Sequence, residues 1–178
     1  VPLQLESIRT LPEYEFLKNL PGFGEEPDQK YYLDLETHKT LASYLTKLKK
    51  KKRYNIKRDQ KRIAALKPQI RIDQIADLEE LFKLNILRFK LKYPDNPAER
   101  SAFEDPTHQQ VFRNLVSRAK DYKARVISTI INGKVEAVEI ALIYNNIYYS
   151  LNSGANIAGY SGIGIFSNLL EIEDALNE

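Results

Sequence analysis

A glycine-rich segment between two predicted elements could bind an anion. Four of the chain's seven glycines lie within eleven residues that lead from a predicted strand into a predicted helix: Gly154, Gly159, Gly162 and Gly164. Glycines allow backbone N–H groups to approach a ligand closely, and a helix N-terminus adds unpaired donors that favour an anion such as a pyrophosphate. The segment has neither the lysine of a Walker motif nor a complete G-x-G-x-x-G fingerprint. The alternative is a turn in which Gly162 and Gly164 serve packing only.

A second candidate site is a block of positive charge from Thr46 to Ile63. It holds ten Lys or Arg residues and one Asp, a local charge of +9, so the rest of the chain sums to −6. Concentrated like charge destabilises a compact state and is usually kept to bind an anion. The residues expected to bind an anionic substrate are Arg53, Lys57 and Arg58. The alternative is an exposed helix face that pairs with the protein's own acidic side chains. Those considered are Glu25, Glu26, Glu79 and Glu80.

Composition excludes several classes of site. The chain has 178 residues, 43% of them hydrophobic, which fits one globular domain. It has no Cys and only His38 and His108, so we expect no disulfide and no metal site. There is no apolar run long enough for a membrane span and no signal peptide at the start, so we expect a cytoplasmic protein. The acidic residues of the last predicted helix are expected on its exposed side. They are Glu171, Glu173, Asp174 and Glu178.

The pattern of apolar residues predicts the elements that hold these candidates. Residues 1–28 combine four Pro with two Gly and are expected to form an irregular lead-in. Residues 29–36 predict a first strand, and helical spacing follows from residue 37 to Pro68 with a break near residues 50–54. A short strand is then expected at 70–72, with helices that begin near residues 77, 107 and 165. The strongest prediction is an antiparallel meander over 124–131, 135–144 and 147–152, because Asn132-Gly133 favours a two-residue hairpin turn.

The order of these elements and four short segments match the pattern of a known family. The segments are the basic run Lys51–Arg62, the hairpin Ile131–Ala137, the tyrosine-rich strand Ile147–Ser150 and the glycine-containing helix start Ser161–Gly164. In these features the chain resembles the GNAT superfamily of acyl-coenzyme A dependent N-acyltransferases. More narrowly it resembles the cellulose-biosynthesis-type (CelD-like) acetyltransferases, which are related to the FemAB aminoacyltransferases.

The resemblance implies an α+β fold for residues 29–178. This is the GNAT-like architecture of a mixed, mainly antiparallel sheet flanked by helices. Family members continue past the last helix with further strands, so we expect the domain to be truncated at its C-terminus. The absence of Met and an end inside a predicted helix also lead us to expect a fragment.

The resemblance also implies an activity and a donor site. The expected reaction transfers an acyl group from acyl-coenzyme A, such as acetyl-coenzyme A, to an amine of a small molecule or of the cell envelope. Direct attack by the amine needs no covalent intermediate. The residues expected to hold the donor follow from the family pattern. They are Ser161, Gly162, Ile163 and Gly164 at the helix start, and Ser150 and Asn152 on the preceding strand.

Three residues are candidates for the chemistry that this resemblance implies. Acyl transfer to an amine needs a proton acceptor, an oxyanion donor and an acid for the departing thiolate. Glu139, inside an otherwise apolar strand, can act as the base if burial raises its pKa. The alternative for Glu139 is an outward-facing position on the solvated side of the hairpin. Tyr148 and Tyr149 point to opposite faces of their strand, so one of the two is available as a proton donor.

Two other functions remain open at this stage. A FemAB-like enzyme would take its aminoacyl group from charged tRNA, and the basic block favours that partner. A module without catalytic activity would use the helix at 47–62 to bind nucleic acid or another anion. A lone aromatic residue in the block, Tyr54, gives little support for base stacking.

Overall fold

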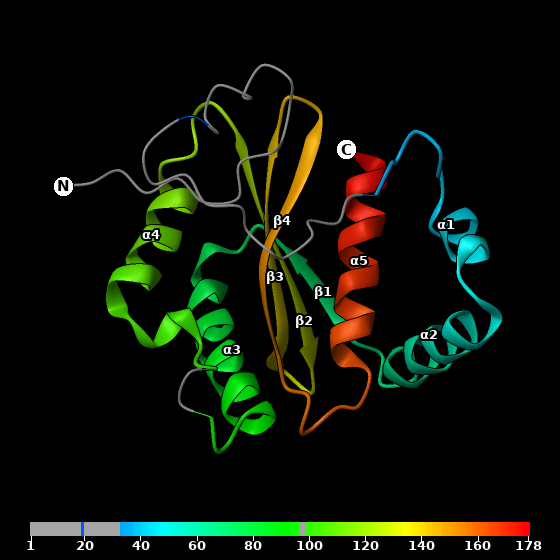
Figure 1. The fold of residues 1–178 in the computed structure, drawn as a ribbon, viewed down its shortest axis with the longest axis horizontal. Coiled ribbons are helices and arrows are strands. Elements are labelled where there is room, and N and C mark those ends of the chain that lie inside the picture. The colour runs from blue at the N-terminus through cyan, green and yellow to red at the C-terminus, as the bar shows by residue number, and fades with distance from the viewer. Residues whose placement is uncertain (1–18, 20–32, 97–98) are drawn as a thin grey trace. The chain divides into compact units, whose positions relative to one another are not determined.

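The computed structural model describes residue 19, residues 33–96 and residues 99–178 (Figure 1). Contacts within the chain separate Val1–Asp34 from a compact unit, Leu35–Glu178, which contains every element discussed below. Its helices are α1 (Leu41–Lys47), α2 (Lys50–Ala64), α3 (Leu78–Lys92), α4 (Pro106–Ser117) and α5 (Ile163–Asn177), with short 3-10 helices η2 (Ile75–Asp77) and η3 (Ala102–Glu104). Its strands are β1 (Gln69–Ile72), β2 (Lys123–Ile131), β3 (Lys134–Tyr144) and β4 (Ile147–Ala155).

The fold class is α+β, as predicted. The lead-in predicted at 1–28 and the first part of the strand predicted at 29–36 lie outside the described residues, apart from residue 19. Residues 33–36 do not form a strand, because the backbone turns at Leu35 and the His38 N–H donates to the Leu35 carbonyl at 3.2 Å. The predicted helix break lies at 48–49, slightly before the predicted position.

The four strands of the described unit form one antiparallel sheet in the order β1-β2-β3-β4. The three-strand meander is confirmed, with β4 running three residues further than predicted. Asn132 and Gly133 have φ values of 52° and 76°, the left-handed conformation that a tight hairpin turn requires. Asn145 and Asn146 repeat this at the second turn, with φ values of 48° and 57°. Turn chemistry therefore sets the register of the sheet that carries Glu139.

Helices cover both faces of this sheet (Figure 1). On one face α3 and α4 bury a cluster that includes Phe82, Phe103 and Phe112 against Val138 and Ile140 of β3. On the other face α5 covers a second cluster. Its members are Ile63, Ile131, Ala137, Ala155, Ile163 and Phe166. Helices α1 and α2 then pack on the outer side of α5 through Leu45, Ile56 and Leu169. Because side chains alternate along a strand, the odd-numbered centre of β3, including Glu139, faces α5.

Helix α3 approaches β4 so closely that one glycine is required. A Cβ atom on Gly154 would lie 2.5 Å from the Leu81 carbonyl oxygen and 3.0 Å from the Asn85 nitrogen, both backbone atoms. The buried Asn85 amide fixes the same contact, because its Nδ2 donates to Asn152 Oδ1 at 2.9 Å and to the Ser153 carbonyl at 2.6 Å. Gly154 therefore serves helix packing.

We predict that Gly154→Ala destabilises the fold. The added methyl group meets backbone that cannot move alone, so the free energy of unfolding should fall by about 1–3 kcal/mol. Gly164→Ala is the matched control, since a Cβ there meets nothing within 4 Å and Ala is favoured over Gly in a helix by up to about 1 kcal/mol. Urea unfolding measures both variants. Equal stability of the two would contradict the packing role of Gly154.

Candidate functional site

The start of α5 lies directly against α2. Gly162 precedes the helix with φ at 91°, and a Cβ atom on it would lie 2.7 Å from the Asp59 Cβ. The Phe166 N–H donates to the Gly162 carbonyl at 3.0 Å, so the N–H groups of Gly164 and Ile165 precede the first full helical hydrogen bond. These two donors and the helix dipole make the turn suitable for a negatively charged group.

A guanidinium from α2 reaches the same turn. Arg62 Nη1 donates to Ser161 Oγ at 2.9 Å and lies 3.4 Å from the Ser161 carbonyl oxygen. Asp59 is buried beside it and accepts from Arg58 Nε at 3.0 Å. Two cations therefore surround one buried carboxylate, which leaves the turn with a net positive environment. The glycine turn and the basic block, separate features of the sequence, form one site.

Of the three predicted anion-binding residues of the basic block, only Arg58 lies near this turn, through its pairing with Asp59. Arg53 Nη1 donates to the Thr46 carbonyl at 3.0 Å and so ties α2 to α1. Lys57 is exposed and lies on the opposite side of the helix from Asp59, because two residues correspond to just over half a helical turn. Arg58 pairs with Asp59. Arg62 could have been singled out from the sequence, since it shares a helical face with Asp59 and with Ile63 of the core.

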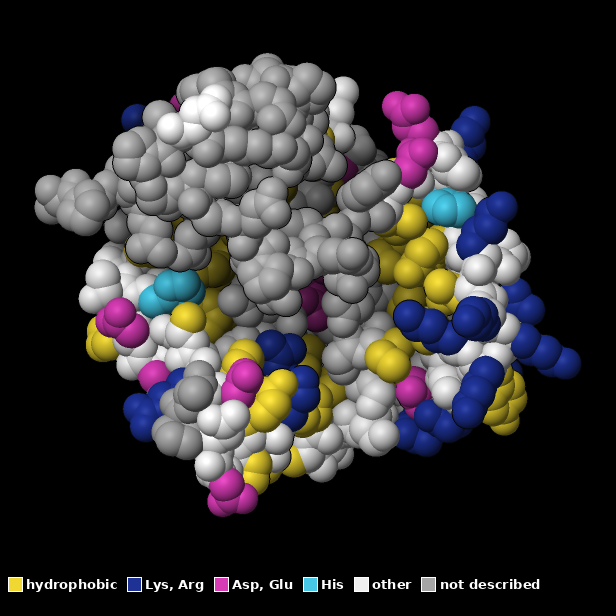
Figure 2. All heavy atoms as spheres, in the orientation of Figure 1, with side chains coloured by type: hydrophobic (Ala, Val, Ile, Leu, Met, Phe, Trp, Pro, Cys, Tyr) yellow, Lys and Arg dark blue, Asp and Glu magenta, His cyan; other side chains and the backbone are white. Residues whose placement is uncertain are grey.

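The outer face of α2 carries unpaired positive charge. Lys50, Lys57 and Lys61 are exposed on the side opposite Asp59, with Tyr54 67% exposed among them. Figure 2 shows Lys and Arg side chains gathered on the flank formed by α1 and α2. Within the described part of the chain these three lysines have no acidic partner.

The predicted acidic partners are engaged elsewhere. Glu79 binds Arg113 at 2.7 Å, and Glu80 binds Lys83 at 2.7 Å. The alternative in which the basic block pairs with these two residues is therefore wrong. Glu25 and Glu26 lie outside the described residues.

Glu139 is buried beneath α5. Its side chain is 2% exposed, so the solvent-facing alternative is wrong, because α5 covers this side of the hairpin. Its register partner on β4 is Ser153. Burial first, and then the negative charge of Glu171, raise the pKa of Glu139 well above its usual range. Arg88 opposes this shift only in part.

Glu171 is the buried residue that sequence reasoning missed. It was expected on the exposed side of α5 but is 6% exposed and points towards the sheet. Glu171 Oε2 accepts from Ser150 Oγ at 2.9 Å, and burial raises the pKa of the Glu171 carboxyl to about 7 in spite of that hydrogen bond. The residues around Glu171 in the sequence did not indicate its burial, since acidic residues usually face solvent.

The far end of α5 forms an ionic cluster with β2. Asp174, also expected on the exposed side, accepts from Arg125 Nε at 2.8 Å, and Arg125 also binds Asp73 and Glu178. The Arg125 side chain is only 8% exposed, so these carboxylates compensate for its burial. Of the acidic group on this helix, Glu173 is exposed as expected.

The two tyrosines lie in different environments. Tyr148 donates its hydroxyl to Asp174 Oδ2 at 3.0 Å, and burial together with nearby carboxylates raises its pKa. Tyr149 is 40% exposed, and neighbouring residues of a strand point to opposite faces. The structure therefore associates Tyr148, and not Tyr149, with the carboxyl groups under α5.

Strand β4 is an edge strand in the sheet that the described residues form. A bulge interrupts its pairing, because Ile140 pairs with Asn152 and Ala141 pairs with Ser150. The predicted donor-binding side chains on β4 already have hydrogen-bond partners: the exposed Ser150 donates to Glu171, and the half-buried Asn152 accepts from Asn85. What β4 offers to a ligand is the backbone N–H and C=O groups along its outer edge.

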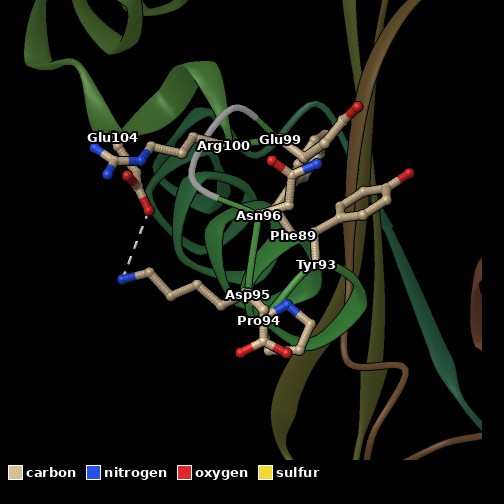
Figure 3. A pocket seen from close by; sticks show the side chains of 9 residues that line it. Phe89, Tyr93, Pro94, Asp95, Asn96, Glu99, Arg100 and Glu104 are labelled. Atoms are coloured by element: carbon tan, nitrogen blue, oxygen red, sulfur yellow. Dashed lines mark ion pairs between the residues drawn. The ribbon is translucent and has the colours of Figure 1, made fainter.

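Two pockets lie elsewhere on the described surface. One of about 380 Å³, at the C-terminal end of α3, has Phe89 and Tyr93 in its wall and a Lys90–Glu104 ion pair at 3.6 Å (Figure 3). Another of about 510 Å³ lies between α3 and the β2–β3 turn. Neither is lined by Glu139 or by residues 161–164. Among the described residues there is no cluster of side chains arranged to hold a metal ion, and no helix long and apolar enough to cross a membrane.

Comparison with protein families gives one match to this chain. Residues 50–172, from the start of α2 into the last turns of α5, match the Acetyltransferase (GNAT) domain. The match therefore covers more than half of the chain, including the glycine turn, the basic helix and the buried carboxyls. No curated protein matches the chain. The narrower relationship to CelD-like or FemAB proteins stays a prediction.

We predict that Glu171→Gln makes folding stability less dependent on pH. A carboxyl whose pKa rises from 4.5 to about 7 on folding stabilises the native state below about pH 4.5, and this contribution is lost as the pH rises through 7. Between about pH 4 and pH 8 the free energy of unfolding of the wild type should fall by about 3 kcal/mol relative to that of the variant. Urea unfolding across this range tests it, with Glu173→Gln as the exposed control. If the free energy of unfolding depends on pH in the same way in the wild type and in Glu171→Gln, the raised pKa of Glu171 is contradicted.

Proposed function

Because the chain belongs to the family of GNAT acetyltransferase domains, we propose that it transfers an acyl group from acyl-coenzyme A to an amine. The observation that carries the proposal is the turn at Ser161–Gly164, where a helix N-terminus and the Arg62 guanidinium meet. The acceptor is an amine of a small molecule or of the cell envelope.

The residues at the turn fit the phosphates of the donor. The Gly164 and Ile165 N–H groups and the Ser161 hydroxyl supply hydrogen-bond donors, and Arg62 supplies a charge suited to phosphate. Space above Gly164 is open, since a Cβ there would meet nothing within 4 Å. The amide groups of the pantetheine arm would pair with the free edge of β4, as a strand would.

The buried Glu139 and the half-buried Tyr148 are the side chains considered for the proton transfers. The acceptor ammonium loses one proton to the Glu139 carboxylate, and the free amine attacks the thioester carbonyl carbon. The C–S bond then breaks, the nitrogen gives up its second proton, the thiolate of coenzyme A takes up one proton, and the amide product remains. Of the two tyrosines, Tyr148 is the one that contacts the carboxyl groups near α5, because its hydroxyl donates to Asp174; its raised pKa makes it a weak proton donor to the thiolate.

We predict that Arg62→Gln weakens coenzyme A binding. Losing a charge-assisted hydrogen bond should raise the Kd for coenzyme A and for acetyl-coenzyme A by roughly 10-fold. Lys57→Gln, which removes one charge from the opposite side of the same helix, should leave the Kd unchanged at moderate salt. Isothermal titration measures all three proteins.

Gly162 is a poor choice of variant for this test. A side chain there would be strained at φ 91° and would displace Asp59, so a loss of binding could simply result from a shift of α2.

Absence of coenzyme A binding by the wild-type chain, or an equal effect of Arg62→Gln and Lys57→Gln on the Kd, would reject the donor site.

A second candidate function rests on the outer face of α2. Lys50, Lys57 and Lys61 have no acidic partner in the described part of the chain, and Tyr54 is exposed between them. Such a face fits a phosphate-rich partner, including tRNA as a source of an aminoacyl group or another nucleic acid.

We predict for this second function that RNA binding weakens steeply with salt. Each lysine neutralised should lower the slope of log K against log salt by about 0.7 for a single strand, so the triple variant K50Q/K57Q/K61Q should lower it by about 2. Arg62→Gln, which removes one charge at the turn, is the comparison variant. Fluorescence anisotropy with tRNA and with a single-stranded RNA measures the slope, and a slope unaffected by the triple change would reject this function.

A further inference from the structure

Two carboxyl groups beneath α5 are buried with one oxygen each left unsatisfied. Glu139 Oε1 and Glu171 Oε1 have no hydrogen-bond partner among the described residues. The two residues are 2% and 6% exposed. Hydrogen bonds from Ser167 and Ser153 lower the pKa of Glu139 but do not offset the effect of its burial. A buried polar atom that has no partner costs stability, so two in one place call for a common explanation.

The two carboxyl groups are neighbours. Glu171 binds Ser150, and Ser150 lies opposite Ala141 in the sheet. Ala141 is two residues from Glu139 on the same strand, so both project to the face that α5 covers. Ser167 lies one helical turn before Glu171 and therefore on the same side of α5. The charge of Glu171 acts on Glu139, which agrees with this proximity.

Positive charge around the pair is largely engaged elsewhere. Arg88 of α3 donates to Ser153 Oγ at 3.1 Å, and its charge acts on Glu139 from the β4 side. Arg125 of β2 binds Asp174 at 2.8 Å and is also shared with Asp73 and Glu178. The remaining facing groups are Asp174 of α5 and Tyr148 of β4, which bind each other. Within the described residues no cation forms an ion pair with Glu139 or Glu171.

We propose that Glu139 and Glu171 share one proton in the folded protein. Two adjacent buried carboxylates that lack a paired cation cannot both ionise at neutral pH. A proton on one carboxyl turns an acceptor oxygen into a donor for the other, which would satisfy the two unpaired carboxyl oxygens together. The pair therefore carries a charge of −1 near neutral pH.

The shared proton gives Glu171 a role in the transfer reaction, and this part rests on the proposed function. When the acceptor ammonium gives one proton to the ionised carboxyl of the pair, the pair passes from one proton to two. Each turnover converts an ammonium and a thioester into an amide, a thiol and one released proton, so the pair must return that proton to solvent. Glu171, which accepts a hydrogen bond from Ser150, is the positioning residue that supplies the second carboxyl of the pair.

The test is a carboxyl titration that needs no substrate. The chain is labelled with ¹³C at the Glu side-chain carboxyl, and Glu139 and Glu171 are assigned by their glutamine variants. We expect one of the two carboxyl groups to stay protonated near pH 7. Removing either carboxyl should lower the titration midpoint of the other by about one pH unit or more. Glu171→Asp should retain the coupling, and Glu173→Gln, on the exposed side of α5, should not change it.

Two results would overturn the proposal. One is complete ionisation of both groups below about pH 6 in the wild-type chain, a measurement that needs no variant to fold. The other is a Glu139 midpoint that is the same with and without the Glu171 carboxyl. Coupled titration of Glu139 and Glu171 in a chain that binds no coenzyme A would uphold the shared proton and reject the donor site. Failure of the shared proton and failure of the proposed function can therefore be told apart.

Discussion

Polar contacts fix helix α5 at both ends, to α2 at its start and to strand β2 at its far end. At its start, Gly162 lies so close to Asp59 of α2 that a side chain would not fit, and Arg62 bonds to Ser161. At its far end, Asp174 binds Arg125 of β2. Apolar contacts of Ile163 and Phe166 fill the space between. The position of this helix determines both where an anion can meet its N-terminus and which acidic side chains are excluded from water.

Burial of charged groups is compensated at the far end of α5 but not beneath its middle. The ionic cluster of Arg125 compensates for the burial of its charges because three carboxylates surround one guanidinium. Glu139 and Glu171 have no such compensation, and their raised pKa values reflect the cost. Unfavourable burial of titratable groups is common where proton transfer is required. The same carboxyls therefore connect the stability of the domain, its pH dependence and its proposed chemistry.

The sequence predicts local features of this domain better than it predicts contacts between elements. The meander follows from Asn132-Gly133 and from alternating apolar residues, since turn and strand preferences are local. The burial of Glu171 could not be predicted, because an acidic residue is assigned to the solvent side unless the element that covers it is known. Likewise Gly154 looked like part of a ligand loop, and only its distance to α3 identifies it as a packing residue. Arg62 differs from these cases, because the apolar residue Ile63 marks the face of α2 that packs towards α5, whereas charge density alone favours Lys57 equally.

In the function we propose, the start of α5, next to Arg62, binds the phosphates of an acyl-coenzyme A donor. Amide chemical-shift mapping by NMR during addition of coenzyme A tests this residue by residue. We expect the largest shifts on residues 161–165 and along the outer edge of β4. Shifts confined to the outer face of α2 or to the pocket at the end of α3, or no shifts at all, would contradict it.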